Sequence, residues 1–478
     1  MDFTIRIGLE VHIQLKTATR LFSAEPYAYG QSPNRFIDPV TLGLPGTLPS
    51  INARAIDQAI TLALAAQCSI NRRITFDRKN YFYPDLPKGY QITQKTNPVG
   101  IKGSLDYIDP RKKIRTLEIK QVHLEEDSGK SIYQQHRISI DYNRAGVPLA
   151  EVVTSPGLSS PGEAAAFVDY LKILVRELGI STGKMETGAI RCDANISLSR
   201  PDETHGHNEI KNLNSTRALK KALTLEIERQ KNEYNTHTFK RGYTLHFDDQ
   251  KNINLFGRKK ESAAEYGYIP EPDILPVYLS RKKEEKLKRK IPELPAQRYQ
   301  RFMEQYQLSA DRAYWLTMNK DLSCFFESIY PGTEDKQELI HFLTGPYRSL
   351  DKKINRRKFL TDKRFKMNII SLINMITRNE ISRESAYQNL WPMLPFSENK
   401  TTFDLAKSGG WLLRKPGDEL LEVIRTTIAE FPEEVSAYRN GKSKILGFFM
   451  GFIINKTKKR YQPQKIKRLL LEELRKSC

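Results

Sequence analysis

Cysteine is scarce in this sequence, and the few cysteines are scattered. Only four occur among 478 residues, with no two in a Cys-x-x-Cys pair: Cys68, Cys192, Cys324 and Cys478. Such a distribution provides neither a zinc knuckle nor a disulfide framework, and it fits a reducing cytosol. The sequence is therefore not that of a small secreted domain held together by disulfide bonds.

Long apolar runs are absent as well. The longest, from Ile445 to Ile454, is about half the length that spans a bilayer. The first strand-like segment begins at Ile5, which leaves no room for a signal or transit peptide. We expect a soluble, cytoplasmic protein that has no contact with a membrane.

A complete phosphate-binding loop is also missing. The segments 129–131 and 441–443 both read Gly-Lys-Ser and resemble the end of a Walker loop. The glycine required five residues earlier is replaced in each case, by Leu124 and by Ser436. If ATP binds, we expect it on the sheet, through metal and side chains.

Positive charge is what the sequence has in excess. Its 77 Lys and Arg against 56 Asp and Glu give a formal net charge of +21, which indicates a polyanionic partner, most simply nucleic acid. Residues 351–366 hold eight Lys or Arg and two Asp, and residues 456–476 hold nine Lys or Arg and two Glu. Solvated helix faces are the alternative, but two such runs in the C-terminal half favour nucleic acid.

The sequence patterns divide the chain into three predicted domains: 1–292, 293–407 and 408–478. The first is α+β, and the other two are helical and basic. Strands are expected at 116–124, 137–143, 189–198 and 209–213, and helices at 53–66, 161–178 and 215–232. The breaks fall at Pro292-Glu293-Leu294-Pro295 and near Gly409-Gly410.

The segment from Ile5 to Leu15 shows the clearest pattern. Odd positions are apolar, and even positions are Arg, Gly, Glu, His and Gln. This alternation predicts a strand with one buried face. Glu10 and His12 then lie side by side on the open face, where a carboxylate next to an imidazole can bind a metal or transfer a proton. An incidental pair on a solvated sheet face is the alternative.

Further strand-like segments repeat this design. Their polar faces carry short, directional side chains rather than the loose mixture of Lys, Glu and Thr that is typical of a solvated face. The residues are Arg191, Asp193, Asn195 and Ser197; Arg137, Ser139, Asp141 and Asn143; His123, Glu125 and Asp127; and Glu209 and Lys211. Carboxylates suit Mg²⁺ and arginines suit phosphate. The pattern favours an open, acidic, metal-binding sheet face.

Residues 77–91 combine aromatic, proline and cationic residues too densely for regular structure. Long loops with fixed Pro and Gly are often functional, and a rigid surface loop is the alternative.

These segments together resemble the GatB family, the B subunits of the bacterial aspartyl/glutamyl-tRNA amidotransferases. The likeness covers essentially the whole chain, and so many long motifs in order are highly specific. The motifs are Gly8-Leu9-Glu10-Val11-His12 and residues 44–49, 77–91, 123–130, 143–149, 190–197, 209–215, 270–273 and 441–447.

The resemblance implies a fold and an activity. The fold would be a cradle-like catalytic domain on a largely antiparallel sheet, related to glutamine synthetase, followed by an all-α helical domain and a tRNA-binding helical tail. The activity would be ATP- and Mg²⁺-dependent amidation of misacylated Glu-tRNA(Gln), Asp-tRNA(Asn) or both, through an acyl phosphate. In the heterotrimer, a glutamine-hydrolysing amidase, the A subunit, would deliver ammonia, and the small C subunit would wrap around both.

The resemblance also implies roles for residues of this chain. The metal would be held by Glu10, His12, Glu125 and Glu209, with Glu126 as a catalytic neighbour. The nucleotide would be bound by Arg191, Asp193, Asn195 and Lys211. The ammonia path or the acceptor end would be lined by Lys79, Tyr81 and Lys88.

The chain departs from the family's pattern in three places. Many relatives have four zinc-binding cysteines where this chain has Ser23, Glu25, Asp38 and Thr41, so no zinc is expected. Thr187 replaces one of two adjacent glutamates, and Ala264, Glu265 and Gly267 replace His, Asp and Arg. The alternative function is therefore a non-catalytic tRNA-binding scaffold, although retention of every strand-face acid favours the enzyme.

Overall fold

The protein forms two compact units that meet in the sequence at Tyr314 and Trp315. The computed structural model describes residues 3–134, 137–200, 203, 206–236, 238–259, 266–350, 356–397, 400–414, 417–457 and 460–476. Parts of the two basic stretches, 351–355 and 458–459, lie outside these residues, as do Ala264, Glu265 and Cys478. Among the helices that the structure describes, none combines the length and hydropathy that a membrane span requires.

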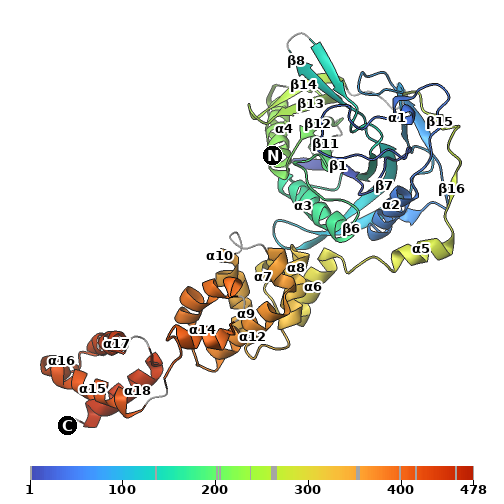
Figure 1. The fold of residues 1–478 in the computed structure, drawn as a ribbon. Helices are drawn as coiled ribbons and strands as arrows, with labels where there is room; N and C mark the ends of the chain where they lie inside the picture. Colours follow the sequence, from blue (N-terminus) through green and yellow to red (C-terminus); the bar gives the residue numbers. More distant parts are fainter. Residues whose placement is uncertain are drawn as a thin grey trace. The chain divides into compact units, whose positions relative to one another are not determined.

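A nine-stranded sheet forms the framework of the first unit (Figure 1). Its strand order is β14-β13-β12-β11-β1-β10-β7-β6-β2, and only β12 and β13 are parallel. The strands are β1 Thr4–Gln14, β2 Ser69–Ile70, β6 Gly100–Ile108, β7 Ile114–Glu126, β10 Pro148–Thr154, β11 Ile190–Ser199, β12 Asn208–Leu213, β13 Tyr243–Asp248 and β14 Ile253–Lys259. The expected α+β class with a largely antiparallel sheet is confirmed.

Three small sheets complete the strands and correct two predictions. They pair β15 (Ile269–Pro270), β4 (Asp77–Asn80) and β5 (Tyr90–Thr93); β16 (Val277–Tyr278) and β3 (Arg73–Ile74); and β8 (Lys130–Gln134) and β9 (Arg137–Asp141). Segment 77–91 therefore begins and ends in strands rather than being irregular throughout. The strand at 137 exists, but among the described residues it pairs with β8 alone. Its predicted polar face is consequently not part of the large sheet, because alternation predicts a strand but not its partner.

Helices of the first unit begin where the sequence signals predicted them. Asn52 caps α2 (Ala53–Ala65), Ser160 caps α3 (Pro161–Glu177), and Ser215 Oγ accepts from Ala218 N in the first turn of α4 (Thr216–Thr236). The other helices described in this unit are α1 Pro39–Leu42, α5 Arg281–Lys288 and α6 Pro295–Gln305, and the boundary between the units falls within α7 Ala310–Thr317. The predicted helix starts are confirmed to within one residue.

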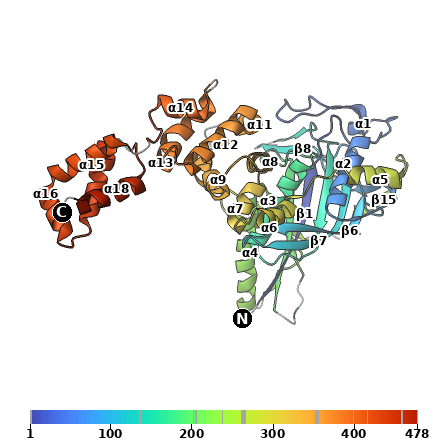
Figure 2. The same cartoon turned by 90° about the horizontal axis from the view of Figure 1, so that it is seen from below.

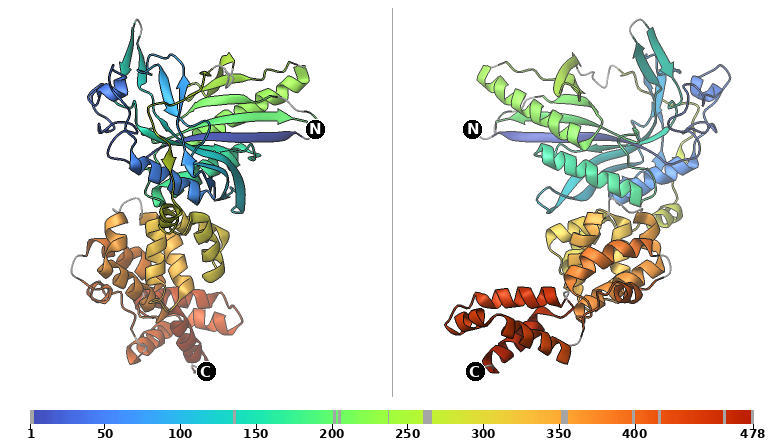
Figure 3. Two further views of the ribbon diagram at one scale, coloured as in Figure 1. Left: turned by 90° about the vertical axis from the view of Figure 1, so that its right-hand side faces the viewer. Right: turned by 60° about the vertical axis from the view of Figure 1, so that its left-hand side comes forward.

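One face of the large sheet is buried beneath helices. The views in Figure 3 show α3 and α4 side by side along the sheet, and α2 packs on β6 and β7. The apolar positions of β1, including Leu9 and Val11, are almost completely buried in the resulting core together with Phe167 of α3. Because side chains alternate along a strand, burial of this face leaves the polar positions on the other.

The second unit is helical in all its described elements. They are α8 Lys320–Ile329, α9 Lys336–Phe342, η2 Leu343–Tyr347, α10 Arg348–Leu350, α11 Arg356–Thr361, α12 Lys363–Thr377, α13 Arg383–Ser385, η3 Ala386–Leu390, η4 Trp391–Phe396, α14 Thr402–Ser408, α15 Asp418–Glu430, α16 Pro432–Arg439, α17 Ile445–Lys456 and α18 Pro463–Lys476. Helices α15 to α18 share a hydrophobic core built around Ile424, Phe449 and Leu470. Figure 2 shows α15, α16 and α18 gathered near the C-terminus. Division of the helical part at residue 407 stays a prediction.

Candidate active site

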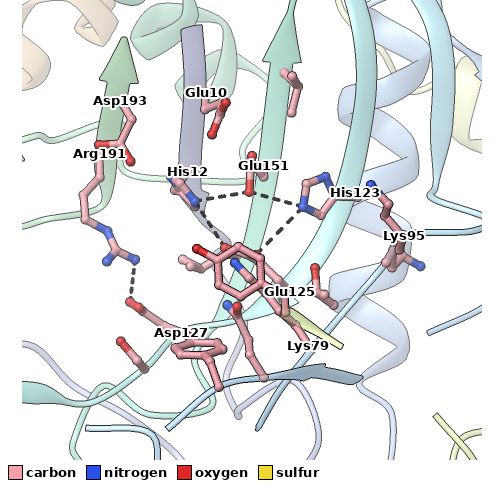
Figure 4. Close-up of a pocket in the computed structure, with 18 of the residues that line it drawn as sticks. Glu10, His12, Lys79, Lys95, His123, Glu125, Asp127, Glu151, Arg191 and Asp193 are labelled. Atoms are coloured by element: carbon pink, nitrogen blue, oxygen red, sulfur yellow. Dashed lines mark ion pairs between the residues drawn. The ribbon is translucent and has the colours of Figure 1, made fainter. Parts of the chain in front are cut away.

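Polar side chains from neighbouring strands gather on the open face of the large sheet. The antiparallel register places His12 of β1 between Arg191 of β11 and Glu151 of β10. Glu151 in turn lies opposite His123 of β7. The four side chains therefore form one row across four strands, and Figure 4 shows them lining a common cavity. The cavity has a volume of about 500 Å³.

The centre of this row is a cluster of imidazoles and carboxylates. His12 Nε2 lies 3.3 Å from Glu125 Oε1 and 3.2 Å from Glu151 Oε2 (Figure 4). His123 Nε2 lies 3.2 Å from the same oxygen of Glu151. One ligand atom each from His12, Glu125 and Glu151 fall within 4.8 Å of one another. We call these three residues the His–Glu cluster.

Electrostatics favours the charged forms of His12, His123 and Glu151. Burial opposes a charge on His12, but Glu151, Glu125 and Asp193 outweigh it and raise the imidazole pKa to about 9. The same balance of burial against Glu151 and Glu125 raises the pKa of His123 to about 10. Burial would raise the pKa of Glu151, yet the two histidines hold it well below its usual value. Both imidazoles are thus protonated at neutral pH when no cation is bound.

The donor set of the His–Glu cluster fits a divalent cation. Two carboxylates converge from adjacent strands, and Mg²⁺ prefers a few carboxylates together with water and phosphate oxygens. Of the four residues predicted as metal ligands, His12 and Glu125 belong to the cluster. Glu10 and Glu209 line the same cavity beside it. A bound cation would replace the protons on the imidazoles, whose positive charge balances the carboxylates when no cation is bound.

A second set of ion pairs lies on β11 and β12. Lys211 Nζ is 2.9 Å from Asp193 Oδ2 and 3.3 Å from Glu209 Oε1. These two carboxylates overcome the effect of burial and raise the pKa of Lys211. Asn195 Nδ2 donates to Glu10 Oε1 at 2.9 Å. Of the four residues predicted to bind the nucleotide, Lys211 and Asn195 therefore contact carboxylates of the sheet, and Asp193 is itself such a carboxylate.

Arg191, the fourth of these residues, pairs with Asp127, the residue directly after β7. Arg191 Nη2 lies 2.7 Å from Asp127 Oδ2, as the dashed line in Figure 4 shows. Arg144 Nε approaches the same oxygen to 3.1 Å. Because Asp127 is almost completely buried, this carboxylate is well placed to orient both guanidinium groups.

The wall opposite the sheet face is aromatic and cationic. Lys79 Nζ lies 4.5 Å from the ring centre of Tyr266 and 5.4 Å from that of Tyr81. Lys95 Nζ lies 5.5 Å from the ring centre of Tyr268. Burial is the largest of the effects that raise the pKa of Tyr268, to about 12. Lys79 and Tyr81, predicted to line the ammonia path or the acceptor end, are thus both at the cavity.

Glu126 and Lys88 lie elsewhere. Glu126 follows Glu125 on β7, so its side chain points to the other side of the strand. Lys88 Nζ lies 2.6 Å from Glu126 Oε2, and the amide of Ile92 donates to Glu126 Oε1 at 2.9 Å. Neither residue is among the described residues that line the cavity.

Some residues of the site were not predicted from the sequence. They are Glu151, Lys95, Arg258, Tyr266 and Tyr268. Only Glu151 carried a usable signal, since it is the single charged residue in the otherwise apolar or hydroxyl-bearing strand 148–154. The others come from segments without clear periodicity, and their position depends on the folded chain.

The departures from the family's pattern have defined structural settings. Asp38 Oδ2 accepts from Ser23 Oγ at 3.1 Å, and its other oxygen accepts from the amides of Val40 and Thr41. Glu25 N donates to Ser23 Oγ at 3.4 Å, so hydrogen bonds connect all four positions at which relatives were expected to have cysteines. Gly267 lies between Tyr266 and Tyr268 with a left-handed φ of 47°, which a glycine adopts without strain. Ala264 and Glu265 are outside the described residues.

Fold and site together define an α+β protein with a histidine–carboxylate centre on a mostly antiparallel sheet. The family profile described as the GatB/GatE catalytic domain matches residues 5–285, and that of the GatB domain matches residues 325–474. The chain therefore belongs to the GatB family, as its motifs suggested.

Curated relatives extend over the full length of the chain. The B subunit of the aspartyl/glutamyl-tRNA(Asn/Gln) amidotransferase of Clostridium botulinum strain Langeland is 34% identical over 481 residues, with 100% of both chains covered. The protein of the same name from C. botulinum strain 657 is 35% identical over 482 residues, with the same coverage. That of Clostridium kluyveri is 34% identical over 485 residues, with 99% of each chain covered.

Proposed function

We propose that this chain is the subunit that amidates misacylated tRNA. It would convert Glu-tRNA(Gln), Asp-tRNA(Asn) or both to the correct amide with ATP, Mg²⁺ and ammonia. The names of the full-length relatives support this substrate class. The observation that carries the proposal is the His–Glu cluster, since carboxylates buried so close together are costly to keep without a cation or a reaction to serve.

The chemistry explains why such a site needs both a cation and a nucleotide. A carboxylate resists attack by ammonia because its leaving group would be an oxide. Its oxygen would therefore attack the γ-phosphorus of ATP, which breaks the bond to the β-phosphate oxygen and releases ADP. Ammonia would then attack the acyl phosphate, so that phosphate leaves and the nitrogen loses a proton. A bound Mg²⁺ supplies neutralisation of the phosphate charge.

The residues of the sheet face would divide this work. His12, Glu125 and Glu151 would hold the cation, and Glu10 and Glu209 beside them could complete its ligands or accept the proton that the nitrogen loses. Arg191, Asp193, Asn195 and Lys211 would serve the nucleotide from β11 and β12.

The opposite wall and the interior would serve the second substrate and ammonia. Lys79 and Tyr81 would face the acceptor end of the tRNA. The pair of Lys88 and Glu126 lies on the other side of β7 and would border the ammonia path.

The chain would act within a complex. A glutamine-hydrolysing amidase, the A subunit, would produce ammonia, and the small C subunit would complete a cytoplasmic heterotrimer. The first unit would have a cradle related to glutamine synthetase, and the basic helical domains predicted at 293–407 and 408–478 would hold the tRNA. Phosphate neutralisation by Lys and Arg would supply much of this affinity.

The test is amidation by the three-subunit complex. Purified complex is incubated with Glu-tRNA(Gln), glutamine, ATP and Mg²⁺, and the esterified amino acid is then identified. Gln-tRNA is expected only when ATP and Mg²⁺ are both present. The absence of product from an intact, tRNA-binding complex would contradict the proposal.

A non-catalytic tRNA-binding scaffold is the second candidate, favoured by Thr187 and Gly267 where the family's pattern has a glutamate and an arginine. It predicts that Glu10→Gln and Glu125→Gln leave both tRNA binding and product formation unchanged. A loss of about 100-fold or more in product formation with unchanged tRNA binding would eliminate the scaffold, because that loss is typical of removing a group that stabilises transition-state charge.

A further inference from the structure

The wall opposite the sheet face is assembled around β4, the middle strand of the small sheet β15-β4-β5. Lys79 lies on β4 itself, whereas Lys95 follows β5 and Tyr266 precedes β15. Three segments that are far apart in the sequence must therefore keep a fixed spacing for these side chains to line one cavity (Figure 4). Strand pairing with β15 contributes little to this spacing, since β15 has only 2 residues.

Arg78 of β4 fastens the segment that contains β15. Its Nε lies 2.7 Å from Glu271 Oε2 and its Nη2 3.0 Å from Glu271 Oε1, so the ion pair is bidentate. Arg78 Nη2 also lies 2.9 Å from Asp273 Oδ2. Pro270 and Pro272 flank Glu271, and their rings restrict the backbone on both sides of the carboxylate. The motif 270–273 thus presents two carboxylates to one guanidinium group.

Asn80 and Asp77 of the same strand each fasten a further point. Asn80 Nδ2 donates to the carbonyl oxygen of Gly267, the glycine between the two tyrosines that precede β15. Asp77 Oδ2 accepts from the amides of Lys95 at 2.7 Å and Thr96 at 3.0 Å. We call Asp77, Arg78 and Asn80 the β4 clamp. No member of the β4 clamp is among the described residues that line the cavity.

A contribution to stability alone is the alternative role for such bonds. The arrangement of β4 argues against it, because three of its 4 residues hold the two segments that complete the wall. The fourth, Lys79, lies at the cavity, with its Nζ 4.5 Å from the ring centre of Tyr266. One strand therefore both contributes a side chain to the wall and fixes the positions of the neighbouring ones.

We propose that the β4 clamp positions the wall for the reaction, with Asp77, Arg78 and Asn80 as positioning residues. They would set the distances between Lys79 and the side chains that the other two segments bring to the cavity. The inference rests on the proposed function, which assigns Lys79 and Tyr81 to the acceptor end of the tRNA. Accurate placement matters there, because a displacement of about 1 Å can cost about 100-fold in rate.

The experiment separates positioning from stability in the three-subunit complex. Arg78→Lys keeps the charge but loses the planar fork that holds Glu271. Asn80→Ala removes the bond to Gly267 and leaves the ion pair in place. Arg298→Lys is the matched control, because Arg298 forms a similarly bidentate, buried pair with Glu177 that joins α6 to α3, away from the wall.

KM is measured for Glu-tRNA and for ATP separately, and Tm is recorded for each complex. Arg78→Lys and Asn80→Ala are each expected to raise the KM of Glu-tRNA about tenfold and to leave the KM of ATP within about twofold. Arg298→Lys should lower Tm but leave both KM values within about twofold. A loss of stability alone does not produce this difference between two similar ion pairs.

A double substitution tests whether the clamp acts through the wall. In Tyr266→Leu the ring that the clamp positions is already absent, so adding Arg78→Lys should raise the KM of Glu-tRNA by less than about threefold. The full tenfold rise in that background would overturn the inference, since Arg78 would then act independently of the wall.

Two further results would also overturn it. The first is unchanged KM values for Arg78→Lys and Asn80→Ala in a complex that forms product, which leaves the proposed function intact. The second is an equal rise in KM for Arg298→Lys. A wild-type complex that forms no product overturns the function itself, and the inference that rests on it.

Discussion

The two faces of the nine-stranded sheet are formed by the same strands but differ in character: one is apolar and covered by helices, and the other is open and charged. On β1, Leu9 and Val11 are buried beneath the helices, while Glu10 and His12 between and beside them point into the cavity. One face is held by apolar packing, and the other by ion pairs among carboxylates, imidazoles and cations. The strands can therefore fix the spacing of the charged groups on the open face, because apolar packing against the helices holds their other face in place. Changes on the helical face should alter stability, and changes on the open face should alter chemistry.

The largest effect on stability is expected from the helical face. Phe167 of α3 is completely buried, and its ring centre lies 5.5 Å from that of Tyr107 on β6. Phe167→Ala should lower the free energy of unfolding by about 3–5 kcal/mol, because it removes buried apolar surface and leaves a cavity. Urea denaturation followed by circular dichroism measures the change. Phe82→Ala, at a phenylalanine that is 90% exposed, should cost less than about 0.5 kcal/mol. If both substitutions lower the free energy of unfolding equally, apolar packing does not hold the helical face.

On the open face, stability should depend on pH. The pKa of His12 is about 9 and that of His123 about 10, both above the ordinary value near 6.5. The stability that their charge contributes is fully present below about pH 6.5 and is lost as the pH rises through 9 to 10. The depressed pKa of Glu151 acts at the other end, where its contribution is lost on acidification below its usual range.

Without divalent cations, the free energy of unfolding should therefore fall by roughly 2 kcal/mol between pH 6.5 and 10 in excess of the fall in Glu151→Gln. The variant is the reference because it lacks the carboxylate shared by both imidazoles. Parallel pH profiles for the two proteins would show that the histidines are not charged in the folded state.

A smaller effect is expected beside the His–Glu cluster, at Asp127. Asp127→Asn keeps the shape of the side chain but removes the charge that pairs with Arg191 and Arg144. We expect kcat/KM of the complex to fall about tenfold, the cost of one well-placed interaction. Asp169→Asn, on the surface of α3 beside Lys172, is the control and should leave kcat/KM unchanged. If Asp127→Asn behaves like this control, Asp127 does not position Arg191 for the reaction.

Much of the sheet face could be predicted because alternation reveals which residues share a side. Glu10 and His12, Glu125 and Asp127, and Arg191 and Asp193 all lie at the cavity as the alternation and the motifs indicated. The pattern could not reveal which strands are neighbours. For that reason the sequence predicts a polar face on β9 like that of the large sheet, although β9 pairs with β8. Glu151 is likewise absent from the predicted site residues, although it lies beside His12.

The aromatic and cationic wall opposite the sheet face could not have been found in this way. Lys79 is on β4, Lys95 follows β5, and Tyr266 and Tyr268 precede β15. Nothing in their local sequence indicates that Lys79 and Tyr266, nearly two hundred residues apart along the chain, lie in contact in the fold. Glu126 is the opposite case: it follows Glu125 in the sequence, and its side chain therefore lies on the other side of β7.

The most direct test of the proposed site is cation binding by the His–Glu cluster. Mn²⁺ takes the same kind of oxygen ligands as Mg²⁺, and its electron paramagnetic resonance signal reports the free ion during titration of the chain. Wild-type protein and Glu118→Gln, a substitution on β7 outside the cavity, should bind Mn²⁺ equally. Glu151→Gln should weaken binding by at least about tenfold. Equal affinity in all three proteins would contradict the claim that the open face of the sheet holds the cation.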